Sequence, residues 1–557
     1  MRSLLLAFVA AAASSLQLQA AKPNVLFVAV DDLKPAIGCY GDKLAKTPNI
    51  DRLATRSTVF DRAYCMQAVC APSRNALLTG LRPEVLRIYD LGTNFRRRAP
   101  EVETLPQWFK QHGYATHGIG KVFHVGHGNH EDQASWSVPH FQGKTVGYAL
   151  PENGAKLTRE EALFSNEGGD VSKLPRGAAY ESADVSDDTY ADGKIASESI
   201  KRLQEFKKSG APFFLAVGFL RPHLPFCAPK KYWDLHDASK FQLAARKTPP
   251  DGAPAFAPQS SGELRQYSGI PDQGPMPEDL QRTLIHGYYA ATSYMDAQLG
   301  RVLDELEKLG LAENTIIVLW GDHGWHLGDH GMWCKHTNYE QATRAPLIIS
   351  APGRRMSQHT RALVEFVDLY PTLCDLAGLS KPAHLQGESL VQVLDVPATN
   401  RTAAFQVYPR GSKEMGPLLG HGVRTDRWRY VEWRKQDGTA AARELYDLQD
   451  DPQETINVAD RTEKADVVKE HVALLKARLE HPAPAGLKLL DLTAKPKTDR
   501  EALFAKKDKD RDGKLTHEEF LAGQPDPKEA PRRFIRFDTD GDGALTREEF
   551  VFSGEKR

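Results

Sequence analysis

The sequence predicts an α/β fold, in which a mostly parallel sheet flanked by helices precedes a smaller α+β subdomain and an all-α module. Four apolar runs, rich in β-branched and aromatic residues, are typical of strands buried on both faces. Between the third and fourth runs, apolar residues from Leu299 to Leu309 share one helical face, and Gly310 is placed to end that helix. The four runs are residues 24–30, 114–120, 213–217 and 316–320.

The size and charge of the chain limit what it can be. It has 557 residues, which predicts about two to four folded units. The net charge of −1 gives no indication of a protein that binds nucleic acid or another polyanion through its bulk charge. An acidic substrate would therefore have to be recognised by a local site.

The N-terminus resembles a secretory signal peptide. One positive charge at Arg2 precedes the apolar run 4–13, and the small residue Ala20 follows at the expected cleavage site. The run is too short to span a bilayer, and a buried helix is the alternative interpretation. We expect residues 1–20 to be removed and the protein to be secreted or periplasmic, with no membrane span.

Composition shifts along the chain predict its organisation. After about residue 380, short strand-like runs such as 428–433 replace the long apolar runs, and a final amphipathic helix is expected to end near Glu480. A stretch rich in Pro and Lys then indicates a linker. The expected segments are 1–20 (signal peptide), 21–380 (α/β domain), 381–480 (α+β subdomain), 481–499 (linker) and 500–557 (a pair of EF-hands).

The last segment contains an internal repeat with the spacing of the EF-hand calcium loop. Each copy places carboxylates at loop positions 1, 3 and 5, Gly at 6, a backbone carbonyl at 7 and Glu at 12. The alternative interpretation is a pair of solvated acidic turns. The expected Ca²⁺ ligands are Asp508, Asp510, Asp512, Lys514 and Glu519 in the first copy, and Asp538, Asp540, Asp542, Ala544 and Glu549 in the second.

Polar clusters follow each of the four apolar runs. Asp31 and Asp32 come after the first, Lys121 after the second, His223 shortly after the third, and Asp322 after the fourth. In parallel α/β sheets, sites form beyond the carboxyl ends of the strands. We therefore expect these groups to meet in one site.

The segment Cys70-Ala71-Pro72-Ser73-Arg74, followed by Leu78-Thr79-Gly80, resembles the signature of the sulfatase family, which belongs to the alkaline-phosphatase-like superfamily. The resemblance covers about residues 22–480. It implies that Cys70 is oxidised to formylglycine by maturation machinery and that Arg74 lies beside it. A hydrated aldehyde offers one hydroxyl to attack sulfur and a second that later releases sulfate, which divides one hard step into two. An unmodified buried cysteine is the alternative interpretation.

The same resemblance assigns roles to the polar clusters. Asp31, Asp32, Asp322, His323 and residue 70 would hold one calcium ion, although calcium prefers oxygen and His323 could instead contact a ligand. Asp322 would activate the attacking hydroxyl. The other implied roles are sulfate and formylglycine binding for Lys121 and Arg74, proton acceptance during sulfate release for His124, and stabilisation or protonation of the leaving oxygen for His223 and Lys335.

Several local segments are most similar to the iduronate-2-sulfatase branch of the family. They include 120–124 (GKVFH), 221–226 (RPHLPF) and 322–325 (DHGW), where His323 occupies a position that is usually Asn in arylsulfatases. The resemblance implies a sulfated saccharide, and in particular a 2-O-sulfated uronic acid, as substrate. The EF-hand pair is a departure from that branch.

Two other functions remain open from the sequence. The same fold and metal chemistry could serve a formylglycine-dependent enzyme that hydrolyses phosphonate or phosphate esters. A noncatalytic, calcium-dependent glycan-binding protein is the second alternative, but every matched catalytic position retains the expected residue. The sequence also predicts that a chain ending at Glu480 loses mainly stability.

Overall fold

The computed structural model describes residues 22–143, 147–154, 156–167, 170–354, 357–396, 401–481, 483–492, 500–510, 512–523, 529–538 and 540–552. The expected signal peptide and residues 482 and 493–499 of the expected linker lie outside these ranges. The chain forms two compact units, residues 1–489 and residues 490–557. No helix in the described ranges has both the length and the apolar character needed to cross a membrane.

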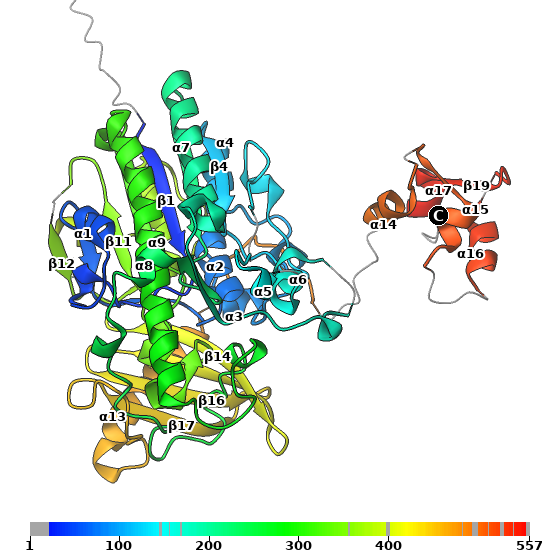
Figure 1. The fold of residues 1–557 in the computed structure, drawn as a ribbon. Coiled ribbons are helices and arrows are strands. Elements are labelled where there is room, and N and C mark those ends of the chain that lie inside the picture. The colour runs from blue at the N-terminus through cyan, green and yellow to red at the C-terminus, as the bar shows by residue number, and fades with distance from the viewer. Residues whose placement is uncertain are drawn as a thin grey trace, which may run out of the picture. The chain divides into compact units, whose positions relative to one another are not determined.

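The first unit is built on a seven-stranded sheet with the order β12-β2-β11-β8-β1-β6-β4 (Figure 1). The four strands β8, β1, β6 and β4 are parallel neighbours, whereas β11 runs antiparallel to both β8 and β2. The predicted mostly parallel sheet is confirmed. Its strands are β1 (Asn24–Val30), β2 (Thr58–Phe60), β4 (Ala115–Gly120), β6 (Phe213–Phe219), β8 (Thr315–Gly321), β11 (Leu347–Ser350) and β12 (Gln358–Thr360).

Strand β1 lies at the centre and is buried along its whole length. Alternate side chains enter two cores. Leu26 and Val28 pack in the core that contains side chains from α1 (Pro48–Ala54), α7 (Ala191–Ser209) and α9 (Glu278–Lys308). On the other face, Phe27 contacts Phe214 and Trp320.

Helix α9 is much longer than the predicted segment near 299–309. It starts at Glu278. In its N-terminal half, buried residues such as Leu284, Tyr288 and Tyr294 lie on more than one side of the helix. A helix that is apolar around most of its circumference lacks the single stripe by which an amphipathic helix is recognised. This explains why the sequence pattern revealed only its second half.

The helix α2 (Cys70–Thr79) is buried at every position, and it lies against α4 and α11. The remaining helices of this region are α3 (Pro83–Leu86), α4 (Leu105–Gln111), α5 (Pro151–Gly154), α6 (Arg159–Ser165), α8 (Lys230–Trp233), α10 (Glu340–Thr343), α11 (Leu369–Leu376) and α12 (Val391–Asp395). The remaining strands pair in twos: β3 (Ala63–Tyr64) with β13 (Val364–Glu365), β5 (Tyr180–Ala183) with β7 (Phe226–Pro229), and β9 (His326–Leu327) with β10 (Trp333–Cys334).

A four-stranded antiparallel sheet and one helix follow within the first unit. The strands are β14 (Ala404–Ser412), β15 (Gly416–Arg424), β16 (Trp428–Lys435) and β17 (Ala440–Asp447), in sequence order. Helix α13 (Ala465–Leu479) packs on them through a core that contains Val423, Tyr430 and Leu475. This is the predicted α+β arrangement. The boundary expected between residues 380 and 381 remains a prediction, because both parts belong to one compact unit.

The second unit contains two helix–loop–helix elements. They are α14 (Arg500–Lys507) with α15 (His517–Leu521), and α16 (Ala530–Phe537) with α17 (Arg547–Phe552). The loops pair through the short strands β18 (Lys514–Thr516) and β19 (Ala544–Thr546), where Leu515 lies opposite Leu545. Phe504, Phe520, Phe534 and Phe550 form the core between the helices.

Candidate active site

Four neighbouring parallel strands deliver the predicted polar groups to one edge of the sheet. Asp31 and Asp32 follow β1, Asp322 follows β8, Lys121 follows β4, and His223 lies four residues beyond β6. Asp32 has a left-handed backbone with φ of 61°, and its N–H donates to Asp322 Oδ1 at 3.0 Å. This backbone bond fixes the two carboxylate segments against each other.

Arg74 connects the helix α2 to both segments. Its Nε donates to Asp322 Oδ2 at 2.9 Å, and one terminal nitrogen donates to Asp31 Oδ1 at 3.1 Å. The other terminal nitrogen donates to the carbonyls of Lys121 and Val122. Burial alone would lower the pKa of Arg74, but the charges of Asp322 and Asp31 raise it above its usual value. The guanidinium is completely buried, and its hydrogen bonds hold the Asp31 and Asp322 carboxylates in place.

Two lysines neutralise the remaining carboxylate charge. Lys121 Nζ donates to Asp31, while Lys335 Nζ donates to both oxygens of Asp32 at 3.0 and 3.1 Å. Lys335 also donates to Glu263 at 2.8 Å. Burial would lower the pKa of Lys335, but Asp32 is the strongest of several negative neighbours that raise it. Both lysines therefore remain charged, which is what an anionic substrate requires.

The carboxylates fit a hard divalent cation. Oxygens of Asp31, Asp32 and Asp322 lie within 4.8 Å of one another, and all three residues are buried. Burial raises the pKa of Asp32 well above its usual value, Asp31 adds to this rise, and the attraction of Lys335 offsets only part of it. One more positive charge beside Asp32 would favour its ionised form, and oxygen donors suit calcium or magnesium.

His323 and residue 70 face the same carboxylates. His323 Nδ1 lies 3.0 Å from the carbonyl of Gly324, so Nδ1 donates to that carbonyl and Nε2 is the ring nitrogen that faces the carboxylates. That Nε2 lies 3.4 Å from Cys70 Sγ and 3.3 Å from Asp32 Oδ1. The sequence-based set of metal ligands is thus brought together. Whether His323 binds a cation directly remains a prediction.

Cys70 is the first residue of α2 and is almost completely buried. Burial, reinforced by Asp31, raises the pKa of its thiol to about 12, so the unmodified side chain is not a thiolate at neutral pH. All six cysteines of the chain lie in described ranges, and none forms a disulfide. An unmodified Cys70 would be a poor nucleophile in this position.

Two buried histidines complete the predicted set. His223 Nδ1 lies 2.5 Å from the carbonyl of Leu224, so Nδ1 carries the proton, and its Nε2 lies 3.3 Å from a Glu263 oxygen. His124 Nε2 lies 3.4 Å from His127 Nδ1. Burial and the neighbouring lysine charges hold the pKa of His124 and of His223 well below its usual value. Both imidazoles are therefore neutral at pH 7, and each has one ring nitrogen without a proton.

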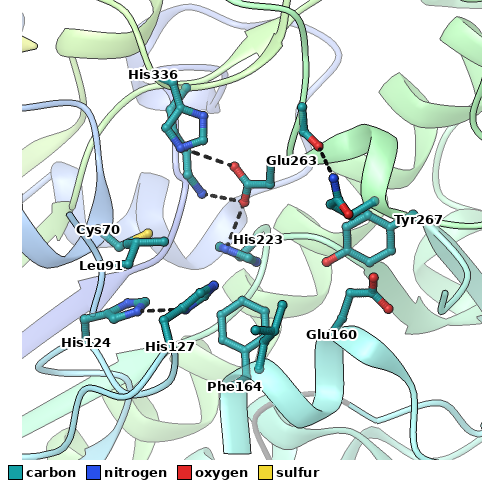
Figure 2. A pocket seen from close by; sticks show the side chains of 14 residues that line it. Cys70, Leu91, His124, His127, Glu160, Phe164, His223, Glu263, Tyr267 and His336 are labelled. Carbon is teal, nitrogen blue, oxygen red and sulfur yellow. Dashed lines mark hydrogen bonds and ion pairs between the residues drawn. The ribbon is translucent and has the colours of Figure 1, made fainter. Parts of the chain in front are cut away.

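A cavity of about 290 Å³ opens over Cys70 (Figure 2). Several of its lining residues lie on loops and on α6, where the sequence contained no recognisable motif. Glu263 contacts both Lys335 and His223, and burial alone would raise its pKa, but Lys335, His336 and His223 lower it to about 2. The residues of the cavity that sequence reasoning missed are Leu91, His127, Glu160, Leu163, Phe164, Gly262, Glu263, Gln266, Tyr267 and His336.

The EF-hand loops have an arrangement suited to cations. In the first loop, oxygens of Asp508, Asp510 and Glu519 lie within 4.8 Å of one another, and Asp508 Oδ1 is buried without a hydrogen-bond partner. Glu519 accepts from the Thr516 backbone and hydroxyl, which fixes the carboxylate at loop position 12. Glu549 is fixed in the same way by Thr546.

The side chains of the two loops also contact each other. Lys514 Nζ donates to Asp542 Oδ2 at 2.9 Å, while Asp538 accepts from the backbone of Gly541 and Gly543. Asp540 accepts from the Asp542 backbone. Within each loop, Asp512 and Asp542 accept from the N–H groups of Lys514 and Ala544, respectively. The expected ligands therefore line two adjacent loops.

The sheet, with its carboxylates and cations at the carboxyl edge, is the alkaline-phosphatase-like fold, and the site is that of a hydrolase of anionic esters. The model of the sulfatase family matches residues 23–379. A model for the C-terminal part of N-sulphoglucosamine sulphohydrolase matches 328–481, and an EF-hand model matches 501–522 and 532–551.

Iduronate 2-sulfatase of Mus musculus is 36% identical over 509 residues, which cover 78% of this chain and 90% of that protein. A protein solved with its substrate D-glucosamine-2-N,6-O-disulfate has a TM-score of 0.64 and 25% identity, and the match covers 82% of this chain and 97% of that one. The phosphonate monoester hydrolase of Silicibacter pomeroyi shares the fold, with a TM-score of 0.66, 23% identity, and coverage of 83% and 96%. The chain belongs to the sulfatase family, and it is a sulfatase enzyme.

Proposed function

We propose that this sulfatase hydrolyses the sulfate ester of a 2-O-sulfated uronic acid in a sulfated saccharide. Formylglycine at position 70 and a calcium ion held by Asp31, Asp32, Asp322 and His323 would serve the reaction. The observation that carries the proposal is the position of Cys70 at the base of a cavity, between the carboxylate cluster and charged lysines. The likeness to iduronate 2-sulfatase supports the choice of sugar.

Formylglycine and calcium would have distinct purposes. Formylglycine, when formed there, supplies a hydrated aldehyde, which does not depend on the pKa that burial raises in the Cys70 thiol. Calcium, when bound, supplies positive charge next to a sulfate oxygen. We also propose that the chain is exported and meets its maturation machinery on the way, which the N-terminal sequence supports.

Charge stabilisation, proton transfer and positioning are assigned to different side chains of the protein. Lys121 and Lys335 provide charge for the sulfate group, and Lys335 is the proton donor for the leaving oxygen because His223 presents an unprotonated Nε2. Neutral His124 accepts the proton that is lost when sulfate departs. Arg74 donates its hydrogen bonds to carboxylates and carbonyls, so we assign it to positioning Asp31 and Asp322.

Sulfate release from a panel of sulfated saccharides tests the proposal. The panel includes 2-O-sulfated uronic acid disaccharides, with calcium present and with protein made in a host that forms formylglycine. Cys70→Ala is the control. Release from the 2-O-sulfated uronate that is lost in the control supports the proposal. Release only from other sugars would keep the mechanism and overturn the substrate. Hydrolysis only of phosphonate or phosphate esters would favour the second candidate, which shares the fold.

A further inference from the structure

The wall of the cavity farthest from Cys70 is formed by α6 and the loop 262–267. Glu160, Leu163 and Phe164 come from α6, and Gln266 and Tyr267 come from the loop. Figure 2 shows the Glu160 carboxylate beyond the Phe164 ring, on the opposite side from Cys70. A saccharide whose sulfate lies over residue 70 would therefore extend towards this wall.

Glu160 is held by one oxygen, and its second oxygen has no partner. Oε2 accepts from the backbone N–H of Gly177 at 2.7 Å. A Cβ at Gly177 would lie 3.1 Å from that oxygen and only 2.2 Å from the Tyr148 hydroxyl, so this close approach requires glycine. Oε1 is buried and makes no hydrogen bond, and the whole residue is only 3% exposed. No ion pair reaches Glu160 from the described residues.

An unpartnered buried acceptor is costly unless a ligand completes it. Burial raises the pKa of Glu160, and the bond from Gly177 opposes this rise. The neighbouring side chains do not donate a hydrogen bond to Glu160 Oε1. The Gln266 side chain already contacts Arg159 and the Gly262 carbonyl, and burial lowers the pKa of His127 to about 4, which leaves it uncharged. No hydrogen bond from the described residues therefore reaches Glu160 Oε1.

We propose that Glu160 is a specificity-determining residue, which accepts a hydrogen bond from a hydroxyl or ammonium group of the saccharide, on the sugar unit next to the sulfated one. The assignment rests on the proposed function, because it takes the sulfated sugar to lie over Cys70. The Phe164 and Tyr267 rings line the same cavity and provide apolar surface there. A carboxylate or sulfate group there would be rejected, since it would place two negative charges together in a buried site.

The test compares the wild type with Glu160→Gln, which keeps the size of the side chain and presents an amide to the cavity. The substrates are 2-O-sulfated disaccharides whose neighbouring hexosamine carries a free amine, an N-acetyl group or an N-sulfate group. A small aryl sulfate, which lacks the neighbouring sugar unit, is the reference. A hydrogen bond to a charged acceptor predicts a loss in kcat/KM of roughly 10- to 100-fold for the donor-bearing disaccharides. The aryl sulfate should be hydrolysed at an unchanged rate.

The arms separate the two sources of the donor. A loss confined to the free amine identifies an ammonium group, whereas equal losses for the amine and the N-acetyl substrate identify a hydroxyl. Glu161→Gln is the matched control, because Glu161 lies on the same helix, caps it through Thr158 and does not line the cavity. The proposal would be overturned if Glu160→Gln hydrolysed every disaccharide at the wild-type rate. It would also be overturned if the aryl sulfate lost as much activity as the disaccharides.

Failure of the proposed function can be told apart from failure of this inference. If wild-type enzyme releases sulfate from none of the disaccharides, their binding is measured instead by calorimetry. The proteins are then Cys70→Ala alone and Cys70→Ala combined with Glu160→Gln. A 10- to 100-fold weaker binding in the double variant would still support the role of Glu160. Equal affinities in the two proteins would contradict it.

Discussion

The active site and the EF-hand pair both gather carboxylates, but they balance the charge in opposite ways. In the active site, the buried Asp31, Asp32 and Asp322 are matched by the buried cations Arg74, Lys121 and Lys335. In the EF-hand loops the acidic residues are exposed or half-buried, and the Lys514–Asp542 pair is itself half-exposed.

This difference indicates what each region needs from a metal ion. The active site obtains most of its charge balance from the fold, so its architecture should survive without calcium, even though the chemistry would not. The EF-hand loops obtain little balance from their own cations, so their structure should depend on calcium. The predictions that follow separate these two behaviours.

Replacing Cys70 by Ala should have the largest effect. We expect sulfate release to fall by at least about 10³-fold, because the reacting group itself is removed. The buried side chain is small, so the thermal unfolding of the first unit should change little, and calcium binding by the EF-hands should not change. Sulfate release, calorimetry and calcium titration measure the three quantities. Substantial turnover by Cys70→Ala would contradict the assigned reacting group.

Removing calcium with a chelator should abolish activity and leave the first unit folded. The loss should reach about 10²-fold or more, because a divalent cation contributes several kcal/mol of charge stabilisation. Circular dichroism should show a loss of helix that corresponds to the second unit only. Full activity in chelator, with no metal retained by mass spectrometry, would refute the carboxylate cluster as a metal site.

Replacing Arg74 by Ala should destabilise the first unit by about 3–5 kcal/mol, because buried Asp31 and Asp322 would each lose a partner. The matched change in the exposed loop is Asp510→Asn. It should alter the stability of the calcium-free chain by less than about 0.5 kcal/mol, as is usual for a surface position. Chemical denaturation measured in chelator gives both values. Similar effects from the two variants would remove the distinction between the two regions.

Acid should destabilise the first unit at His140. Burial lowers the pKa of His140 to about 4, whereas the unfolded chain keeps a value near 6.5. At this residue the unfolded state therefore binds more protons between pH 6.5 and 4, so its contribution to stability falls as the pH falls. Taken alone, His140 would account for a loss of about 3 kcal/mol across this window. Its neighbour Glu131, whose pKa burial raises to about 8, acts in the opposite direction. The melting temperature of His140→Gln should decline less steeply between pH 7 and 4.5, and parallel curves would exclude this cause.

Changing Glu519 and Glu549 to Gln should have the smallest effect on catalysis. Each residue would supply the last carboxylate of its loop, so calcium binding by the second unit should be lost. Sulfate release should stay within about twofold of wild type. A chain that ends at Leu489 should behave similarly, because the second unit begins at Leu490. A large loss of activity in either protein would show that the EF-hands act on the active site.

The sequence predicted best what is encoded locally. Each EF-hand loop places its ligands within a short stretch of chain, so spacing alone indicated Asp508 and Glu519 as members of one loop. The four buried strands were equally clear, and their adjacent order in the sheet explains why Asp31, Lys121 and Asp322 meet. Residues that follow neighbouring parallel strands lie close together, so their positions at strand ends were enough to predict that they form one site.

The far wall of the cavity could not be predicted in this way. Glu160 and Glu263 lie on a short helix and a loop, without periodicity or a motif, and their roles depend on contacts such as Gly177 with Glu160. The proton positions were equally hidden, because the bond from His223 to the Leu224 carbonyl follows from the local backbone. Such contacts depend on the tertiary structure, so they cannot be predicted from the composition of the chain or from the spacing of motifs.

The most direct test of the central claim measures activity against the fraction of protein that carries formylglycine at position 70. Mass spectrometry of the peptide that contains residue 70 gives this fraction for preparations made with and without the maturation machinery. Sulfate release from the 2-O-sulfated disaccharide should be proportional to the modified fraction and fall to zero with it. Equal activity in fully unmodified protein would show that formylglycine is not the reacting group.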